Sequence, residues 1–154
     1  MSAPLWKALV LAGACAVTVG GCDDDDDGPP SLLPATYPAG FSEVRDCRFS
    51  VEHSAVNIRI LADGPGTAVF ADESYPFPVG TLVVKEEYRD MQCRDLVGYT
   101  LMERRPDGDE EASDGWAWQR LDAAAKVIGP DDDRSCTGCH RSCTMGRDGV
   151  CADP

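Results

Sequence analysis

Apolar and polar residues alternate along the middle of the chain, a pattern that predicts β-strands. Val56, Ile58 and Ile60 alternate with Asn57 and Arg59, as in a strand with one buried face. Three further segments have β character: residues 81–88 (TLVVKEEY), 96–104 (LVGYTLMER) and 116–121 (WAWQRL). β-Branched and aromatic residues are frequent in them, and turn-forming residues separate them. The pattern therefore predicts several short, successive strands.

The helical signals in the sequence are short. Gly64-Pro65-Gly66 is expected to break the chain after the first strand, and residues 67–72 could form one helical turn. The Ala-rich residues 122–126 could form another. Successive strands with short connections usually pair as neighbours. We therefore expect an α+β fold that is mainly β, with an antiparallel sheet and a few short helices.

The N-terminus has the pattern of an export signal. Lys7 supplies positive charge, and an apolar run follows over residues 8–19, too short to span a bilayer. The run ends in Val19-Gly20-Gly21-Cys22, similar to a bacterial lipobox. We expect residues 1–21 to be a lipoprotein signal peptide and Cys22 to carry lipid; an ordinary secretory signal is the alternative. The protein would then be exported, and its lipid would anchor it in the bacterial envelope, facing the periplasm.

Charge and proline mark the region after the signal. Residues 23–27 are all aspartate, and Pro29, Pro30, Pro34 and Pro38 follow. Repelling charges and repeated prolines do not build a core, so residues 22–40 are expected to be an extended tether and residues 41–154 the folded domain. The whole chain has a net charge of −13, which disfavours a nucleic-acid partner.

Cys136-Thr137-Gly138-Cys139-His140 is the most informative motif. In c-type haem attachment, two thiols with this spacing add to the porphyrin vinyl groups, and the adjacent imidazole binds the iron. A redox-active disulfide is one alternative, but it normally opens a helix in an αβ fold. A structural zinc site is another, but it needs four ligands, and the chain has no second Cys-x-x-Cys pair. We therefore expect one covalent haem c, with His140 as axial ligand.

A sixth iron ligand is not evident in the sequence. His53 lies in a polar stretch typical of a surface histidine. Met145 is too close to His140 along the chain to reach the opposite haem face easily, and Met91 and Met102 have no supporting pattern. The default expectation is five-coordinate iron.

Four cysteines remain if Cys136 and Cys139 hold haem and Cys22 carries lipid. In an oxidising compartment they are expected to pair, and we suggest Cys47 with Cys93 and Cys143 with Cys151. The second pair would pin the C-terminal tail beside the haem in a structural rather than a catalytic role.

Two further motifs accompany the haem motif in a family-specific order. Gly80–Glu86 (GTLVVKE) resembles the GTxxVKE strand of the cytochrome P-460 family, and Gly115–Trp118 (GWAW) resembles its later Gly/Trp strand. With Cys136–His140, their order and spacing agree from about Phe41 to His140. The resemblance implies a mainly β, often dimeric protein with one five-coordinate haem. Members of the family oxidise hydroxylamine, and their haem is bonded to a lysine at a meso carbon. The related cytochrome c-prime-beta lacks that bond and binds nitric oxide.

The resemblance assigns roles to individual residues. His140 would be the axial ligand, Cys136 and Cys139 the thioether donors, and Lys85 the family lysine. On a strand, Lys85 shares a face with Thr81 and Val83, where burial would lower its pKa; the alternative is a lysine that points to solvent beside Glu86 and Glu87. Glu103 and Glu87 are candidates for a proton-accepting carboxylate, by strand position only. Trp116 and Trp118 either pack over the haem or belong to the core.

Three functions stay open at this stage. The leading one is redox chemistry on small nitrogen species, hydroxylamine or nitric oxide, with a soluble redox partner and possible homodimers. The second is a non-enzymatic electron carrier or gas-binding cytochrome. The third is a disulfide-stabilised envelope lipoprotein domain without haem.

Overall fold

The computed structural model describes residues 29–51, 53, 56–129, 133–143 and 146–152. The six strands are β1 (Phe41–Ser50), β2 (Val56–Asp63), β3 (Leu82–Tyr88), β4 (Leu96–Arg104), β5 (Trp116–Asp122) and β6 (Val127–Gly129). The two helices are α1 (Gly64–Asp72) and α2 (Asp133–His140). The expected signal peptide and Cys22 lie outside the described residues. Among the described helices, none has the length and apolar character needed to cross a membrane.

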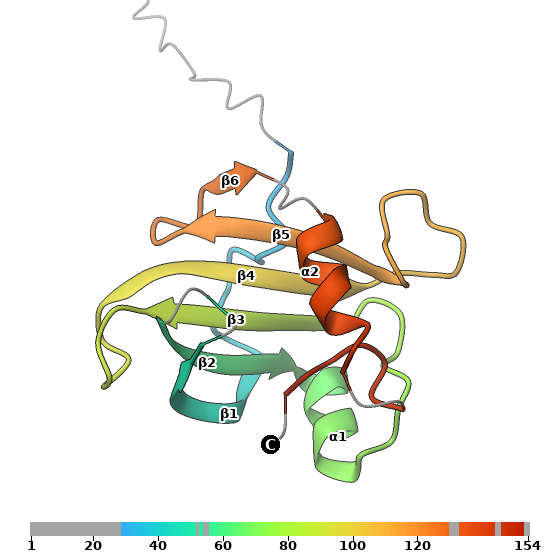
Figure 1. Ribbon diagram of the computed structural model, residues 1–154, viewed down its shortest axis with the longest axis horizontal. Coiled ribbons are helices and arrows are strands. Elements are labelled where there is room, and N and C mark those ends of the chain that lie inside the picture. The colour runs from blue at the N-terminus through green and yellow to red at the C-terminus, as the bar shows by residue number, and fades with distance from the viewer. Residues whose placement is uncertain (1–28, 52, 54–55, 130–132, 144–145, 153–154) are drawn as a thin grey trace, which may run out of the picture.

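The strands form one antiparallel sheet in the order β1-β2-β3-β4-β5-β6, so each pairs with its neighbours in the sequence (Figure 1). This architecture confirms the expected fold class, mainly antiparallel β with a few short helices. The alternating segments 56–60, 81–88, 96–104 and 116–121 correspond closely to β2, β3, β4 and β5.

β1 has no regular pattern in the sequence. Its alternation is broken by charged residues, including Glu43, Arg45 and Arg48, and the register against β2 shifts between Glu43 and Arg45 and again between Arg45 and Arg48. A strand that changes register twice does not keep a period of two. β6 has no such pattern either, because three residues are too few for one.

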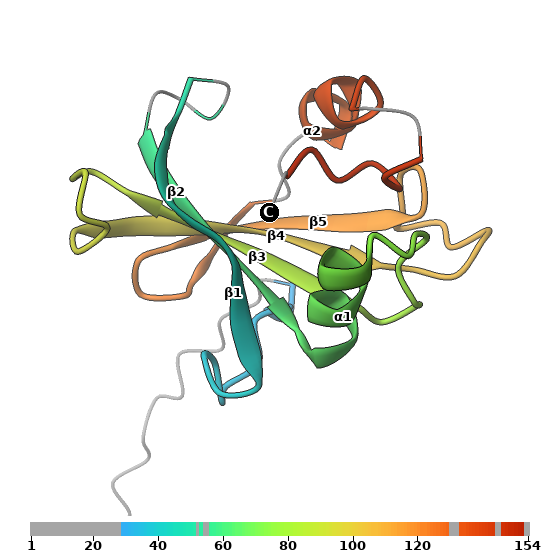
Figure 2. The same cartoon turned by 90° about the horizontal axis from the view of Figure 1, so that it is seen from below.

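The register divides the sheet into two faces. Val83, Met102 and Trp118 are paired in one row across β3, β4 and β5, and so lie on the same face. We call this the helix face, because His140 of α2 contacts Trp118 on it. Val84 and Leu101 lie on the opposite face, which we call the N-terminal face. Figure 2 shows α2 and the N-terminal segment on opposite sides of the sheet.

Each face has its own apolar core. The core of the helix face includes residues of α1 and of the C-terminal tail: Ile58, Ile60, Ala62, Val69, Phe70, Phe77, Val83, Met102, Trp116, Val150 and Ala152. The core of the N-terminal face is smaller: Leu82, Val84, Leu101 and Leu121, with Leu32, Leu33 and Tyr37 packed against it. α1 and the tail are thus fixed against a sheet that is packed on both sides.

The expected break at Gly64-Pro65-Gly66 is instead the first turn of α1. Asp63 is the N-cap, and its carboxylate accepts a hydrogen bond from the Gly66 N–H at 2.9 Å. Pro65 fits there because the first helical residues need no N–H donor. The helix therefore begins three residues before the helical turn predicted at residues 67–72.

The predicted helical turn at residues 122–126 is wrong. Asp122 ends β5 and residues 123–126 connect it to β6; the Asp122 carboxylate accepts the N–H groups of Ala124 at 2.9 Å and Lys126 at 3.0 Å. Ala125 has a positive φ of 62°, which an α-helix excludes. An aspartate side chain that captures nearby backbone N–H groups favours a turn over the helical preference of alanine.

The N-terminal segment is packed earlier than the expected domain start near Phe41. Gln119 donates to the Pro30 carbonyl at 2.9 Å and accepts from the Leu32 N–H at 2.7 Å. Leu32, Leu33 and Tyr37 pack on the N-terminal face. Apolar side chains between the prolines supply the buried area that a tether would lack, so residues 30–40 belong to the folded domain.

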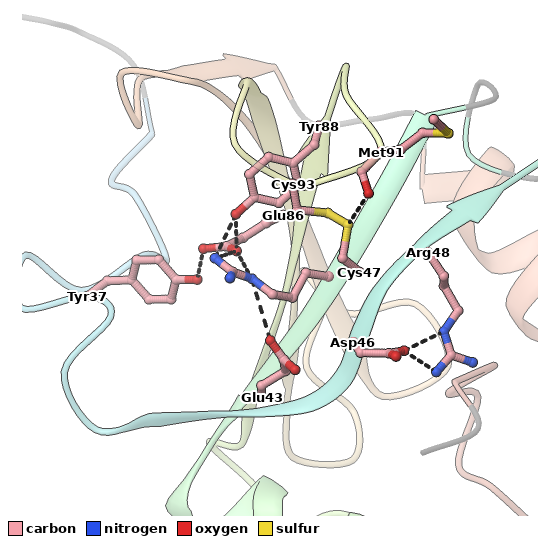
Figure 3. A network of polar contacts seen from close by, with 10 residues as sticks. Tyr37, Glu43, Asp46, Cys47, Arg48, Glu86, Tyr88, Met91 and Cys93 are labelled. Atoms are coloured by element: carbon pink, nitrogen blue, oxygen red, sulfur yellow. Dashed lines mark hydrogen bonds and ion pairs between the residues drawn. A yellow bond between two sulfur atoms is a disulfide. The ribbon is translucent and has the colours of Figure 1, made fainter.

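A polar network anchors this segment (Figure 3). Tyr37 and Tyr88 each donate a hydrogen bond of 2.5 Å to the carboxylate of Glu86, which is 5% exposed. Arg59 donates to the same carboxylate at 2.7 Å and to the Tyr88 hydroxyl at 2.7 Å. Glu86 thereby joins β2, β3 and the N-terminal segment.

The structure contains both disulfides that the cysteine count suggested. Cys47–Cys93 links β1 to the connection between β3 and β4, and Cys143–Cys151 closes the tail after α2. The two bonds lie in different parts of the fold.

Candidate functional site

The Cys-x-x-Cys-His motif lies on α2, which packs over the helix face (Figure 1). Cys136 and Cys139 are one helical turn apart, so their side chains lie on the same side of α2. Neither is part of a disulfide; Cys136 is half-buried and Cys139 is exposed. Thr137 is buried. The helix therefore carries its two cysteines on one side, with Cys139 the more exposed of the two.

His140 is the last residue of α2, and both its orientation and its tautomer are constrained. Its Nδ1 lies 2.7 Å from the Gly149 carbonyl oxygen, and its ring contacts Trp118 edge to face, with centroids 4.6 Å apart. Because a carbonyl only accepts, Nδ1 carries the proton and the lone pair is on Nε2. Burial lowers the pKa of His140; the hydrogen bond to Gly149 opposes this, and the charge of Lys85 lowers the pKa further. A neutral imidazole with Nε2 available is suited to binding a metal.

The tail segment, residues 146–152, supplies the Gly149 carbonyl. Its Asp148 carboxylate accepts the Phe77 N–H at 3.0 Å and lies 3.2 Å from Arg104 Nε. The Asp148 carbonyl accepts the indole N–H of Trp116 at 2.8 Å. Val150 and Ala152 belong to the core of the helix face. The acceptor of the His140 hydrogen bond is therefore firmly attached to the sheet.

Lys85 lies on the helix face and not in solvent. Its side chain is 14% exposed, and its Nζ lies 2.9 Å from Glu87 Oε1. In the same row across the sheet, Lys85 pairs with Thr100, and Thr100 with Arg120. Burial lowers the pKa of Lys85, and the ion pair with Glu87 only partly offsets this effect. The alternative of a solvent-facing lysine is therefore wrong.

Glu87 is held beside Lys85. It accepts a hydrogen bond from the Thr100 hydroxyl at 2.9 Å and is 15% exposed. Burial raises its pKa, but the ion pair with Lys85 and the hydrogen bond from Thr100 together bring the pKa below its ordinary value. At neutral pH this carboxylate is ionised, and its lowered pKa makes it a weaker base than an unpaired glutamate.

Electrostatic interactions connect the strand residues to the helix. Cys136 is close enough to raise the pKa of the Lys85 amine, and the charge of Lys85 lowers the pKa of the His140 imidazole. The structure thus brings Lys85, Glu87, Cys136 and His140 together on one face, as expected if all four belong to one site.

Glu103, the other carboxylate candidate, does not join this group. It pairs with Leu82 and Ala117, so it lies on the N-terminal face, and its carboxylate forms an ion pair of 2.9 Å with Arg105. Strand position alone did not reveal this, because the face of a β4 residue depends on the register of β4 against β3. The assignment of Glu103 as proton acceptor is therefore corrected.

Among the described residues, the other candidate iron ligands lie in three different parts of the fold. Met102 is buried in the core of the helix face, and Met91 is exposed in the connection between β3 and β4. His53 lies between β1 and β2, where its Nδ1 is 2.9 Å from the Ser50 hydroxyl. Met145 lies outside the described residues. Of the two tryptophans, Trp116 is a core residue and Trp118 contacts His140.

A cavity of about 280 Å³ adjoins His140. Its lining comes from α2, the tail, β5 and the connection between β4 and β5: Ser113, Asp114, Trp116, Trp118, Thr137, His140, Arg141, Cys143, Gly146, Asp148 and Gly149. The ion pair between Asp114 and Arg141 lies at its edge. The volume is below the roughly 300–1,000 Å³ typical of pockets for drug-sized ligands. It accommodates a small molecule, not a whole macrocycle.

Two kinds of cofactor are compatible with the residue types near α2. His140, Cys143 and Cys151 offer ligand atoms within 4.8 Å of one another, a possible His/Cys metal-binding group. Its two sulfur atoms are joined in a disulfide, however, so neither is a thiolate that could bind a metal, and His140 is the one effective ligand of the three. Cys136, Cys139 and the His140 Nε2 are the donor types that haem c uses, and they fit that group better.

Several residues of the site carry no signal in the sequence. Thr100 and Arg120 join Lys85 through the register of three strands, and Gly149 contributes a backbone atom. Thr100 and Arg120 could be found only from the correct alignment of the three strands. Gly149 could be found only from the path of the tail in the structure.

Comparison with known proteins adds no relative: the chain matches neither a model of a known protein family nor a curated protein sequence.

Proposed function

We propose that this protein binds one haem c covalently through Cys136 and Cys139, with His140 as axial ligand of the iron. One observation carries the proposal: α2 presents two cysteines outside any disulfide, followed by a histidine whose Nδ1 is already hydrogen-bonded. Nε2 is then the nitrogen available to iron. The resemblance of three motifs to the cytochrome P-460 family supports the same conclusion.

The proposed activity is redox chemistry on small nitrogen species, either oxidation of hydroxylamine or binding of nitric oxide. Haem iron supplies electron transfer and ligand binding in such proteins. Within this chain, Glu87 is the carboxylate that lies beside Lys85 on the helix face, and we assign the proton-accepting role to it on that position.

Lys85 is the residue that would distinguish a P-460 from a cytochrome c-prime-beta. Its lowered pKa increases the fraction of neutral amine, the form with a lone pair for bonding. A bond from Nζ to a haem meso carbon replaces one N–H and one C–H. Formation of this bond therefore releases two protons and two electrons, and an oxidant such as hydrogen peroxide accepts the electrons.

The first test is a haem-stained denaturing gel of protein matured by a haem-attachment system, together with its absorption spectrum. Staining that disappears in Cys136→Ser/Cys139→Ser supports covalent haem, and Cys47→Ser/Cys93→Ser is the matched control that keeps it. A Soret band shifted in wild type but not in Lys85→Arg would support the cross-link. Absence of staining in the wild-type protein would refute the proposal.

A haem protein without enzymatic activity is the second candidate, as a gas-binding cytochrome or an electron carrier. The carrier is less favoured, because Met102 is committed to the core and Met91 is exposed on a distant connection. Hydroxylamine turnover separates enzyme from binder: a stained protein with no turnover that binds nitric oxide is a gas-binding cytochrome. A haem-free domain with every cysteine paired has less support, since Cys136 and Cys139 are not disulfide-bonded.

The surroundings of the protein follow from the N-terminal motif. Export and acylation at Cys22 would hold it at a membrane through lipid alone, and a soluble redox protein would exchange electrons with the haem. Mass spectrometry of the mature N-terminus tests the acylation.

A further inference from the structure

The hydrogen bond to His140 comes from a part of the chain that the resemblance does not include. The acceptor is the Gly149 carbonyl in the tail segment, nine residues after His140. Cys143 lies three residues after His140, and Cys151 lies two residues after Gly149. The disulfide therefore joins the two sides of the hydrogen bond by a short covalent path.

We propose that the disulfide-closed tail is a positioning element for the axial ligand: the Cys143–Cys151 bond and Asp148 hold the Gly149 carbonyl against His140 Nδ1 and so set the orientation and donor strength of the imidazole. This inference rests on the proposed function, because it needs iron at Nε2. Gly149 and Asp148 are positioning residues and not catalytic ones, because they act through His140.

Closing the loop makes the contact persistent. Without the disulfide, Gly149 would be connected to His140 only through the eight residues between them, and the entropy cost of the contact would be larger. Asp148 adds anchorage next to Gly149, through the Phe77 N–H and Arg104 on its carboxylate and Trp116 on its carbonyl. These contacts fix the carbonyl from the sheet side, and the disulfide fixes it from the helix side.

The effect on iron follows from the direction of the hydrogen bond. An acceptor at Nδ1–H raises the basicity of Nε2, and a stronger donor stabilises ferric over ferrous iron. Loss of the acceptor would weaken the iron–histidine bond and make the reduction potential more positive. Trp118, in contact with the ring, would remain to limit its rotation.

The test compares two disulfides in the haem-loaded protein. In Cys143→Ser/Cys151→Ser, we expect the ferrous iron–histidine stretching band to move to lower frequency in resonance Raman spectra, and the reduction potential to become more positive. We expect Cys47→Ser/Cys93→Ser, which removes the distant disulfide, to leave both unchanged. Asp148→Ala should shift both readouts in the same direction as the tail double variant, and Asp148→Asn, which keeps an acceptor for the Phe77 N–H, should shift them less.

The outcomes are distinguishable. A wild-type protein without haem would overturn the proposed function and this inference with it. A haem-loaded protein with unchanged band and potential in both the tail double variant and Asp148→Ala would overturn this inference alone. If the double variant does not fold, Asp148→Ala and Asp148→Asn decide the question by themselves.

Discussion

Gly115 lies where the Arg104 guanidinium leaves no room for a side chain. It has a positive φ of 81°, and its carbonyl accepts a 2.6 Å hydrogen bond from Arg104 Nη1. A Cβ atom at this position would lie 1.7 Å from that nitrogen. The glycine of the GWAW motif is therefore needed for the packing of Arg104, which in turn lies against Asp148.

Replacement of Gly115 by alanine should lower the free energy of unfolding by roughly 2–3 kcal/mol, because strain at positive φ adds to the displacement of Arg104. Chemical denaturation followed by circular dichroism measures this change. Gly108→Ala is the matched control: its φ is 84°, but a Cβ there meets nothing within 4 Å. It should cost only about 1 kcal/mol. Equal losses for both variants would contradict the role given to Arg104.

Glu87 makes the stability of the protein depend on pH in acid. Its pKa in the folded state lies below the ordinary value of 4.5, so the unfolded chain binds a proton more readily. The stabilisation is therefore complete above pH 4.5 and is lost as the pH falls through the folded-state pKa.

Glu87→Gln should reduce stability at pH 7, because Lys85 loses its counter-charge, and should flatten the decline in stability below pH 4.5. Urea unfolding at a series of pH values measures both effects. Glu110→Gln, at an exposed position in the connection between β4 and β5, is the control and should retain the wild-type profile. An acid decline that is as steep in Glu87→Gln as in wild type would exclude this origin.

At the scale of elements, the Glu86 network couples the N-terminal segment to the strands. Glu86→Gln would leave Arg59 without its short ion pair and weaken the hydrogen bonds from Tyr37 and Tyr88 (Figure 3). We expect a loss of about 3 kcal/mol, as for a buried pair that loses one partner.

Limited proteolysis adds a local readout for this variant, because residues 30–40 should become cleavable before the sheet unfolds. Glu43→Gln is the matched control: Glu43 is half-exposed and lies 3.9 Å from Arg59. It should change stability by less than about 1 kcal/mol. Protection of residues 30–40 that is unaltered in Glu86→Gln would show that the apolar contacts alone hold the segment.

The elements that could be predicted are those with a regular pattern and a buried face. β3, β4 and β5 follow from alternation, and the facing of Lys85 and Glu87 to one side follows from their spacing of two. The side itself could not be predicted. It depends on which face α2 covers and on the pairing of three strands. The face of Glu103 also depends on that pairing, and the sequence alone does not give it. The N-terminal segment was misjudged because prolines obscured Leu32, Leu33 and Tyr37 as core residues.

At the scale of the whole molecule, the two disulfides should contribute differently. Cys47–Cys93 closes a separation of 46 residues and Cys143–Cys151 one of 8. Loop-closure entropy then gives about 4 kcal/mol for the first and about 2.6 kcal/mol for the second. Serine pairs at each site, compared by urea unfolding, should reproduce this order.

Combined with the tail experiment, the two disulfide variants separate an effect on global stability from an effect on the iron–histidine bond. Removal of Cys47–Cys93 should cost more stability and leave the iron–histidine band unchanged, whereas removal of Cys143–Cys151 should cost less and shift it. If the band follows global stability instead, the tail has no specific role.

The candidate site illustrates what pattern analysis can reach. Cys136, Cys139, His140 and Lys85 are recognisable from motifs, and the cysteine count suggested both disulfides. The Gly149 carbonyl is a backbone atom with no side-chain signature, and its position depends on contacts from Phe77, Arg104 and Trp116 that are distant in sequence.

The two outer strands of the sheet also determine how copies of this protein meet. β1 changes register twice along its length, and β6 has three residues, so neither margin offers a long, straight row of hydrogen-bonding groups to another chain. Crowded molecules therefore lack a template for strand-by-strand growth into fibrils. A self-complementary contact between side chains on one face of the domain would, by contrast, close into a symmetric dimer.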